Sequence, residues 1–288
     1  MASGLVLIDK PQGITSFDVV AKLRKILGTR KIGHAGTLDP MATGLMLLGV
    51  NQGTKLLQFL VGMDKQYQAT IRLGAATITD DAEGEVVSQA DASGITPAEL
   101  DSEIAKLRGH ISQLPSSVSA KKIDGKRAYD LVREGKEFEL KSKEVLISRF
   151  DRVSEPRAVG EFLDFDVVVD CSSGTYIRAL ARDIGNALGV GGHLTRLRRT
   201  SIGNYKVEDA HVIGEGIEIL PMLQSALEIF PEYEITAAQV VDVRHGKPLG
   251  LNIDQEVVSL SYEGELVAIS KLSNGLHRSQ IVLTEEQP

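Results

Sequence analysis

Segments with strand character follow one another in runs along this sequence and do not alternate one by one with helices. GLMLLGV (44–50) and EFLDFDVVVDC (161–171) have the apolar or alternating character of strands. The clearest helix is TPAELDSEIAKLRG (96–109), in which Thr96 and Glu99 form a capping box. This order argues against a doubly wound parallel sheet and predicts an α+β fold with a central mixed or antiparallel sheet.

Other elements are predicted from the spacing of apolar residues. In the segment 16–28, capped by Thr15 or Ser16, the apolar residues at helical spacing are Phe17, Val20, Leu23 and Leu27. Residues 126–135 and 175–189 are predicted to form two further helices, and residues 66–74 and 144–153 two further strands. The acidic stretch DDAEGE (80–85) is predicted to be an exposed loop.

The character of the sequence changes after about residue 230. One short helix is predicted in AAQVVDVRHG (237–246), and three short strands follow it. Glu263-Gly264 and Asn274-Gly275 separate these strands and are typical of tight hairpin turns. We therefore predict a large domain over residues 1–228 and a small β-rich domain over residues 229–288.

Length and composition narrow the class of protein. The 288 residues, 42% of them hydrophobic, are enough for a substantial core. No apolar run reaches eighteen residues, and the first residues lack the basic flank and apolar stretch of a secretory signal, so we predict a cytoplasmic protein without a membrane partner. The single cysteine, Cys171, excludes an internal disulfide framework. Six histidines without CxxC or HExxH spacing predict no metal site.

The charge distribution is uneven. A net charge of -7 argues, taken alone, against a nucleic-acid binder, because phosphate contacts need lysine and arginine. The acidity is concentrated in residues 201–288, which carry 5 basic and 14 acidic residues, whereas residues 1–200 carry 27 and 25. Arg196, Arg198 and Arg199 also cluster. Basic surface is therefore available in the large domain, although such a cluster is equally typical of a solvated face.

The densest local signal is the segment GHAGTLDPMATG (33–44). Its glycines allow positive φ angles and a close approach of the backbone to a ligand, and Pro40 stiffens the chain after Asp39. The segment therefore presents one carboxylate. The alternative is an ordinary Asp-Pro turn.

This segment closely resembles the catalytic loop of the TruB family of tRNA pseudouridine synthases, with Asp39 at the position of the family's aspartate. Three further stretches resemble family motifs in the same order, namely IDKPQGITS (8–16), DKQYQATIRLG (64–74) and CSSGTYIRALARDIG (171–185). Residues 115–135 and 191–200 extend the similarity to most of residues 4–205, and residues 229–288 loosely resemble the family's PUA-type RNA-binding module. The resemblance implies the pseudouridine synthase fold with a PUA-like C-terminal domain.

The resemblance implies that Asp39 is the catalytic nucleophile. It attacks the target uridine at the base or at the ribose C1′, and the sequence leaves both open. An arginine partner would keep the carboxylate ionised, and Arg178 matches the family position for that role. Arg182, one turn later, is the candidate for a structural arginine.

The resemblance assigns substrate contacts to six residues in all. Tyr67 is expected to stack on the flipped uracil, whereas an isolated tyrosine at a strand start is more often a core residue. The others are Arg178, Leu197 at an apolar wall, His34 filling the gap left by the flipped base, and Lys10 as scaffold or phosphate contact. Tyr176, beside Arg178, completes the six, and packing in the core is an equally open alternative for it.

The implied function is the isomerisation of uridine 55 in the T arm of tRNA to pseudouridine, without metal or organic cofactor. The implied partner is tRNA alone, without guide RNA, and the resemblance suggests a monomer. Two alternatives stay open: a non-catalytic RNA-binding or tRNA-folding protein, a role that could also accompany catalysis, and a guide-dependent synthase, for whose partners the sequence has no basic extension.

Overall fold

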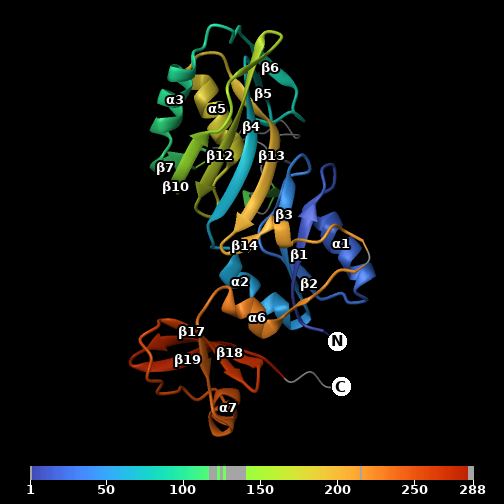
Figure 1. The fold of residues 1–288 in the computed structure, drawn as a ribbon, viewed down its shortest axis with the longest axis vertical. Coiled ribbons are helices and arrows are strands. Elements are labelled where there is room, and N and C mark those ends of the chain that lie inside the picture. The colour runs from blue at the N-terminus through green and yellow to red at the C-terminus, as the bar shows by residue number, and fades with distance from the viewer. Residues whose placement is uncertain (1, 117–121, 124–125, 128–140, 215, 285–288) are drawn as a thin grey trace. The chain divides into compact units, whose positions relative to one another are not determined.

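The computed structural model describes residues 2–116, 122–123, 126–127, 141–214 and 216–284. These residues form two compact units (Figure 1). The first unit contains residues 2–39, 44–62 and the described part of 203–284, and the second contains residues 40–43 and the described part of 63–202. Strands and helices are segregated in both units, so the predicted α+β class is confirmed.

The first unit is built around two long apolar strands that are buried along most of their length. β1 (Gly4–Lys10) pairs with β3 (Thr43–Val50) in antiparallel register from Gly4↔Val50 to Lys10↔Gly44. β2 (Ile32–His34) and β15 (Leu220–Pro221) pair with these strands. The unit also contains α1 (Ser16–Ile26), η1 (Asn51–Lys55), α2 (Leu57–Leu60), β14 (Tyr205–Lys206), η2 (Val207–Asp209) and α6 (Met222–Leu227).

Helix α1 begins as predicted but buries a different face. The Thr15 side chain caps it and forms a capping box with Asp18. Phe17, predicted to belong to the buried stripe, is 68% exposed, and Val19 is buried instead. The buried positions Ser16, Val19, Val20 and Leu23 follow the i, i+3, i+4, i+7 spacing. Phe17 therefore lies about 100° from the start of this stripe.

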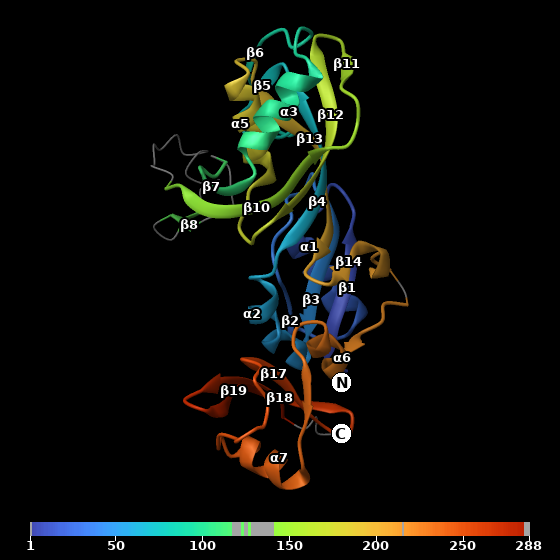
Figure 2. The same ribbon diagram turned by 60° about the vertical axis from the view of Figure 1, so that its left-hand side comes forward.

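The second unit is a twisted antiparallel sheet with two helices packed against it (Figures 1 and 2). Its strand order is β13-β4-β12-β10-β7, with β11 beside β12. The strands of this sheet are β4 (Lys65–Leu73), β7 (Gly109–Gln113), β10 (Lys143–Arg152), β11 (Arg157–Val159), β12 (Phe162–Cys171) and β13 (Gly192–Ile202). Two further pairs form separate two-stranded sheets: β5 (Ala75–Thr77) with β6 (Val86–Gln89), and β8 (Lys122–Ile123) with β9 (Lys126–Arg127). The helices are α3 (Pro97–Lys106), with the predicted capping box, and α5 (Ile177–Ala187).

The predicted helix over residues 126–135 lies mostly outside the described part of the chain. Residues 126–127 form β9, and the other eight residues lie outside the described part of the chain.

The C-terminal strands form a separate four-stranded sheet, here called the small sheet. It consists of β16 (Glu232–Glu234), β17 (Val257–Tyr262), β18 (Glu265–Ser273) and β19 (Leu276–Val282), and α7 (Ala237–Arg244) packs against it. Positive φ angles at Glu263, Gly264, Asn274 and Gly275 confirm the two predicted tight turns. Val240, Val243, Val258 and Leu260 belong to its apolar core.

The small sheet is grouped with the N-terminal strands in the first unit. The ring of Phe59, in α2, meets the ring of Phe230 edge to face at 5.2 Å. The Gln52 side chain donates to Thr284 O (2.6 Å) and accepts from Thr284 N (2.9 Å). The division at residue 228 stays a prediction.

Candidate functional site

Asp39 lies in the loop that joins β2 to β3 in the first unit. The two strands pair as a hairpin, with His34 opposite Leu48. Gly36 and Gly44 have φ angles of 98° and 103°, a conformation that favours glycine. The glycine content of the predicted catalytic loop therefore has a conformational reason, and Asp39 itself is half-buried.

One hydroxyl group holds the residue before Asp39. Ser16 Oγ donates to Leu38 O (2.9 Å), and Leu38 N donates to Ser16 Oγ (2.8 Å). Ser16 is 3% exposed and starts α1, so its position is set by a helix and not by the loop. This contact fixes the backbone immediately before the carboxylate, because both polar groups of Leu38 are satisfied by one buried side chain.

The other two predicted site residues of the first unit have different surroundings. His34 ends β2 and is half-buried. Lys10 is fully buried at the end of β1, and its ammonium group donates to Pro11 O (3.0 Å) and Ile14 O (2.8 Å). These contacts fit the scaffold role expected for Lys10, whereas a phosphate contact stays a prediction.

Tyr67 and Leu197 lie on one face of the sheet in the second unit. Tyr67 is opposite Arg199, and Leu197 is opposite Ala69, in the antiparallel ladder between β4 and β13. Opposite residues of such a ladder point to the same side, so Tyr67, Leu197 and Arg199 share a face. All three side chains are at most 8% exposed.

The three arginines of β13 do not form the single cluster that the sequence suggested. Arg196 and Arg198 pair with Thr70 and Gln68 and point to the opposite face from Tyr67. Arg196 is exposed, whereas Arg199 is 1% exposed. The alternation of a strand separates residues that are adjacent in sequence, so only Arg196 and Arg198 fit a solvent-facing basic surface.

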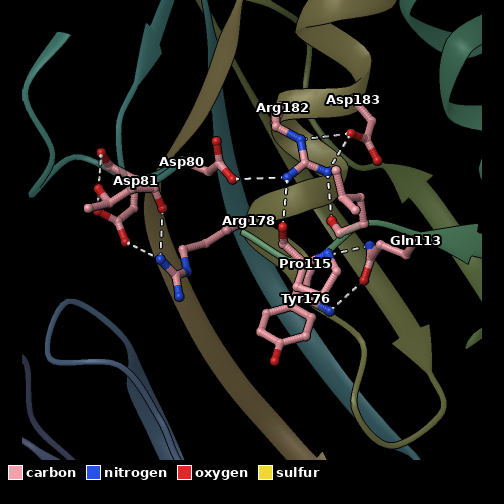
Figure 3. A network of polar contacts seen from close by, with 10 residues as sticks. Asp80, Asp81, Gln113, Pro115, Tyr176, Arg178, Arg182 and Asp183 are labelled. Atoms are coloured by element: carbon pink, nitrogen blue, oxygen red, sulfur yellow. Dashed lines mark hydrogen bonds and ion pairs between the residues drawn. The ribbon is translucent and has the colours of Figure 1, made fainter. Parts of the chain in front are cut away.

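Arg178 is buried on the first turn of α5 and reaches the turn after β5. Its Nη1 donates to Thr79 O (2.7 Å) and pairs with Asp81 Oδ2 (3.2 Å). The two paired side chains are 7% and 4% exposed (Figure 3). A buried guanidinium with a carboxylate and a carbonyl as partners has little freedom to turn.

Asp81 is a functional candidate that the sequence did not reveal. The predicted exposed loop DDAEGE is wrong for its first two residues, because Asp80 and Asp81 are 8% and 3% exposed. Asp81 Oδ1 accepts from Thr79 Oγ1 (2.6 Å) and from Glu83 N (3.1 Å). The burial arises from partners about 100 positions away, and the acidic pattern alone gave no sign of them.

Arg182 has the structural role predicted for it. Its guanidinium donates to Leu114 O (2.8 Å), Asp80 Oδ2 (3.3 Å) and Asp183 Oδ1 (2.8 Å). Burial raises the pKa of the Asp80 carboxyl, although Arg182 opposes that shift. Arg182 therefore ties the second turn of α5 to the end of β7 and to the turn at Asp80 (Figure 3).

Tyr176 is the N-cap residue of α5 and directly precedes the helix. Its own side chain makes no capping bond to the helix. The Gln113 side chain instead binds the Tyr176 backbone on both sides: Tyr176 N donates to Oε1 (2.8 Å) and Nε2 donates to Tyr176 O (3.0 Å). Gln113 was also absent from the sequence-based candidates.

The predicted residues thus fall into two groups, each described within its own unit. The first unit holds Lys10, His34 and Asp39, and the second holds Tyr67, Tyr176, Arg178 and Leu197. The described residues contain no group of three or more histidine, cysteine, aspartate or glutamate side chains arranged to hold a metal ion. Among the same residues, no helix is both long and apolar enough to cross a membrane.

Two family models match the chain. The model described as "TruB family pseudouridylate synthase (N terminal domain)" matches residues 24–177. The model described as "tRNA pseudouridylate synthase B C-terminal domain" matches residues 178–216. The matched regions contain six of the seven predicted site residues.

Curated proteins and solved structures agree with these matches. A protein of Arthrobacter sp. (strain FB24) named tRNA pseudouridine synthase B is 47% identical, over 100% of this chain and 99% of its own length. One of Rhodococcus jostii (strain RHA1) with the same name is 53% identical over 87% and 85%. A chain of a Cbf5-Nop10-Gar1 complex superposes with a TM-score of 0.69 at 26% identity, over 97% of this chain and 84% of that one.

Proposed function

Because this chain belongs to the TruB family of pseudouridylate synthases, we propose that it isomerises uridine 55 in the T arm of tRNA, with Asp39 as the nucleophile. The conversion of a uridine in tRNA to pseudouridine is the activity of its full-length relatives by name. The observation that carries the role of Asp39 is its place in the glycine-containing loop, directly after the residue held by Ser16.

The reaction is balanced without an external reagent. The bond from C1′ to N1 breaks, a bond from C1′ to C5 forms, C5 loses a proton and N1 gains one, so product and substrate have the same composition. A carboxylate nucleophile divides this rearrangement into two steps through a covalent intermediate. Attack at C1′ and attack at the base both satisfy this balance.

The second unit supplies the groups that fit a flipped base. We assign Tyr67 to stacking on the uracil ring and Leu197 to an apolar wall, since both belong to one buried face of the sheet. Arg178 supplies a positive charge at a fixed place, because Asp81 and Thr79 O hold its guanidinium. Within the same proposal, we assign His34, Tyr176 and Lys10 to RNA binding.

We also propose that the enzyme works on tRNA by itself, as a monomer and without guide RNA. The relatives at 47% and 53% identity are named for tRNA, whereas the chain of the Cbf5-Nop10-Gar1 complex is only 26% identical to this chain. The RNA-binding role of residues 229–288 and the cytoplasmic location belong to this proposal too.

The test is incubation of the purified protein with an unmodified tRNA transcript, without guide RNA, followed by chemical mapping of pseudouridine. We expect one modified site in the T loop. Asp39→Asn removes the nucleophile but keeps the size of the side chain, and should lower the rate at least about 10⁴-fold. A second modified site, or full activity of Asp39→Asn, would contradict the proposal.

The same variant separates catalysis from a tRNA-folding role. If the protein also helps tRNA to fold, Asp39→Asn should retain that effect while it forms no pseudouridine. Refolding of a misfolded transcript, followed by aminoacylation, measures the folding effect independently.

A further inference from the structure

Helix α5 carries Arg178 on its first turn, and its starting point is set by a residue of another element. Tyr176 precedes the helix in an extended conformation, with φ −101° and ψ 104°. Its carbonyl accepts from Ala179 N (3.1 Å), the first bond of the helix, and also from Gln113 Nε2 (3.0 Å). Gln113 therefore binds the N-cap residue of α5.

Gln113 is itself held rigidly. It is 2% exposed and ends β7, where it pairs with Lys143 of β10. Its amide satisfies one donor and one acceptor of Tyr176 at 2.8 Å and 3.0 Å, the pattern by which a neighbouring strand would bind this residue. Figure 3 shows the Gln113 amide against the Tyr176 backbone, while the Tyr176 ring extends away from it.

A second contact joins α5 to the residue after β7, on the second turn of the helix. Arg182 donates to Leu114 O (2.8 Å), the residue after Gln113. The start of α5 is therefore attached to the end of β7 at two points, and Arg178 lies between them in sequence. Rotation or sliding of the first turn is opposed at both points.

Two short contacts of Arg178 depend on this placement. A single nitrogen, Nη1, contacts both Thr79 O (2.7 Å) and Asp81 Oδ2 (3.2 Å). Hydrogen bonds weaken steeply with distance and angle, so a displacement of the helix start by about 1 Å would disrupt one or both contacts.

We infer that Gln113 is a positioning residue for the pseudouridine synthase reaction, acting on Arg178 through the backbone of Tyr176. This inference rests on the role proposed above for Arg178. A misplacement of about 1 Å at a reacting group is enough to lower a rate up to about 10²-fold, so loss of the Gln113 contacts should be visible in catalysis.

The test compares two glutamines that bind a backbone in the same way. Gln113→Met keeps the length of the side chain and removes both bonds to Tyr176. Gln52→Met is the matched control, because Gln52 binds both the N–H and the C=O of Thr284. Single-turnover rates at saturating T-arm RNA and the Kd for that RNA are measured at a temperature at which circular dichroism shows each variant to be folded.

We expect Gln113→Met to lower the single-turnover rate at least about tenfold, with Kd within about threefold, and Gln52→Met to leave the rate within about twofold. Gln113→Glu keeps the acceptor for Tyr176 N and loses the donor, so it should fall between Gln113→Met and the wild type. If Gln113→Met does not fold, Gln113→Glu decides, because a wild-type rate in that variant overturns the inference.

A double-mutant cycle distinguishes positioning from general destabilisation. In an Arg178→Lys background, Gln113→Met should lower the rate by less than about twofold, because the residue it positions is already impaired. The inference is overturned if the rate losses of Gln113→Met and Arg178→Lys multiply in the double variant. It is also overturned if Gln52→Met lowers the rate as much as Gln113→Met does. A wild-type rate in Arg178→Lys would instead contradict the proposed role of Arg178, so the two failures are distinguishable.

Discussion

The start of α5 and the small sheet bury charged groups to very different extents. Around α5, two arginines, two aspartates and a glutamine are largely removed from solvent and pair with one another or with backbone groups. The small sheet is held by a core of valine, leucine, isoleucine and alanine side chains. Charges are buried where the proposed chemistry needs fixed groups, whereas apolar packing holds the small sheet, to which no chemical step is assigned.

The largest contrast is expected from Asp81→Ala. This change removes the carboxylate partner of a buried guanidinium, and it should cost about 3–5 kcal/mol of unfolding free energy. The pseudouridine rate should fall at least about 10²-fold because the guanidinium loses its orientation. Denaturant unfolding and single-turnover assays measure the two effects.

The control for that variant is Asp151→Ala. Asp151 also pairs with arginine, at 3.0 Å from Arg108, but both side chains are at least 40% exposed. An exposed pair contributes about 0–1 kcal/mol, so both stability and rate should stay near the wild-type values. Equal losses in the two variants would remove the distinction between buried and exposed pairs.

The small sheet should respond in stability and not in catalysis. Leu260 is 1% exposed in its core, and Leu260→Ala should destabilise the protein by about 2–5 kcal/mol through the cavity it leaves. Hydrogen exchange should accelerate in β17 and β18 first. With saturating RNA, the single-turnover rate should match the wild type, and a loss comparable to that of Asp81→Ala would contradict the comparison.

His277 is a buried titratable residue of the small sheet, and it predicts a pH effect. It is 2% exposed, its Nδ1 lies 3.2 Å from Ser270 Oγ, and its Nε2 has no hydrogen-bond partner among the described residues. Burial lowers its pKa from the ordinary value of 6.5. The unfolded chain therefore binds this proton more readily, so the contribution to stability is complete above pH 6.5 and is lost as the pH falls below it.

The measurement is the unfolding free energy of the wild type and of His277→Gln between pH 5 and pH 8. The wild type should show the steeper decline toward low pH. Parallel pH profiles would mean that His277 does not titrate on unfolding in this range.

The smallest effect concerns the single cysteine. Burial raises the pKa of the Cys171 thiol to about 11, so almost no thiolate is present at pH 8. The folded protein should react with Ellman's reagent at least about 10²-fold more slowly than the unfolded chain. Rapid reaction of the folded protein would show that β12 opens locally.

Local signals explain what could be predicted from the sequence. The helix cap at Thr15, the capping box at Thr96 and the turns at Glu263-Gly264 and Asn274-Gly275 involve residues within four positions of one another, and all are present. The loop with Asp39 was predicted to be catalytic from its glycines and its resemblance to a family motif. Such features can be recognised in the sequence because the interacting residues are close neighbours along the chain.

The missed features all depend on partners far along the chain. Gln113 and Tyr176 are 63 residues apart, and Asp81 and Arg178 are 97 apart. A glutamine at a strand end or an aspartate in an acidic run looks like solvent-exposed surface until the sheet and α5 are assembled around it. The arginines of β13 were grouped wrongly for a related reason, because a strand separates neighbours onto opposite faces.

The buried state of Cys171 also makes this protein a convenient host for reporter dyes. A new cysteine at an exposed position would be the sole thiol that a maleimide dye reaches quickly. Lys25 of α1 and Ser102 of α3 are exposed and lie in the first and second units. A donor and an acceptor at these two positions would report in solution, by energy transfer, how the distance between the units responds to tRNA, with the native sulfur left in place.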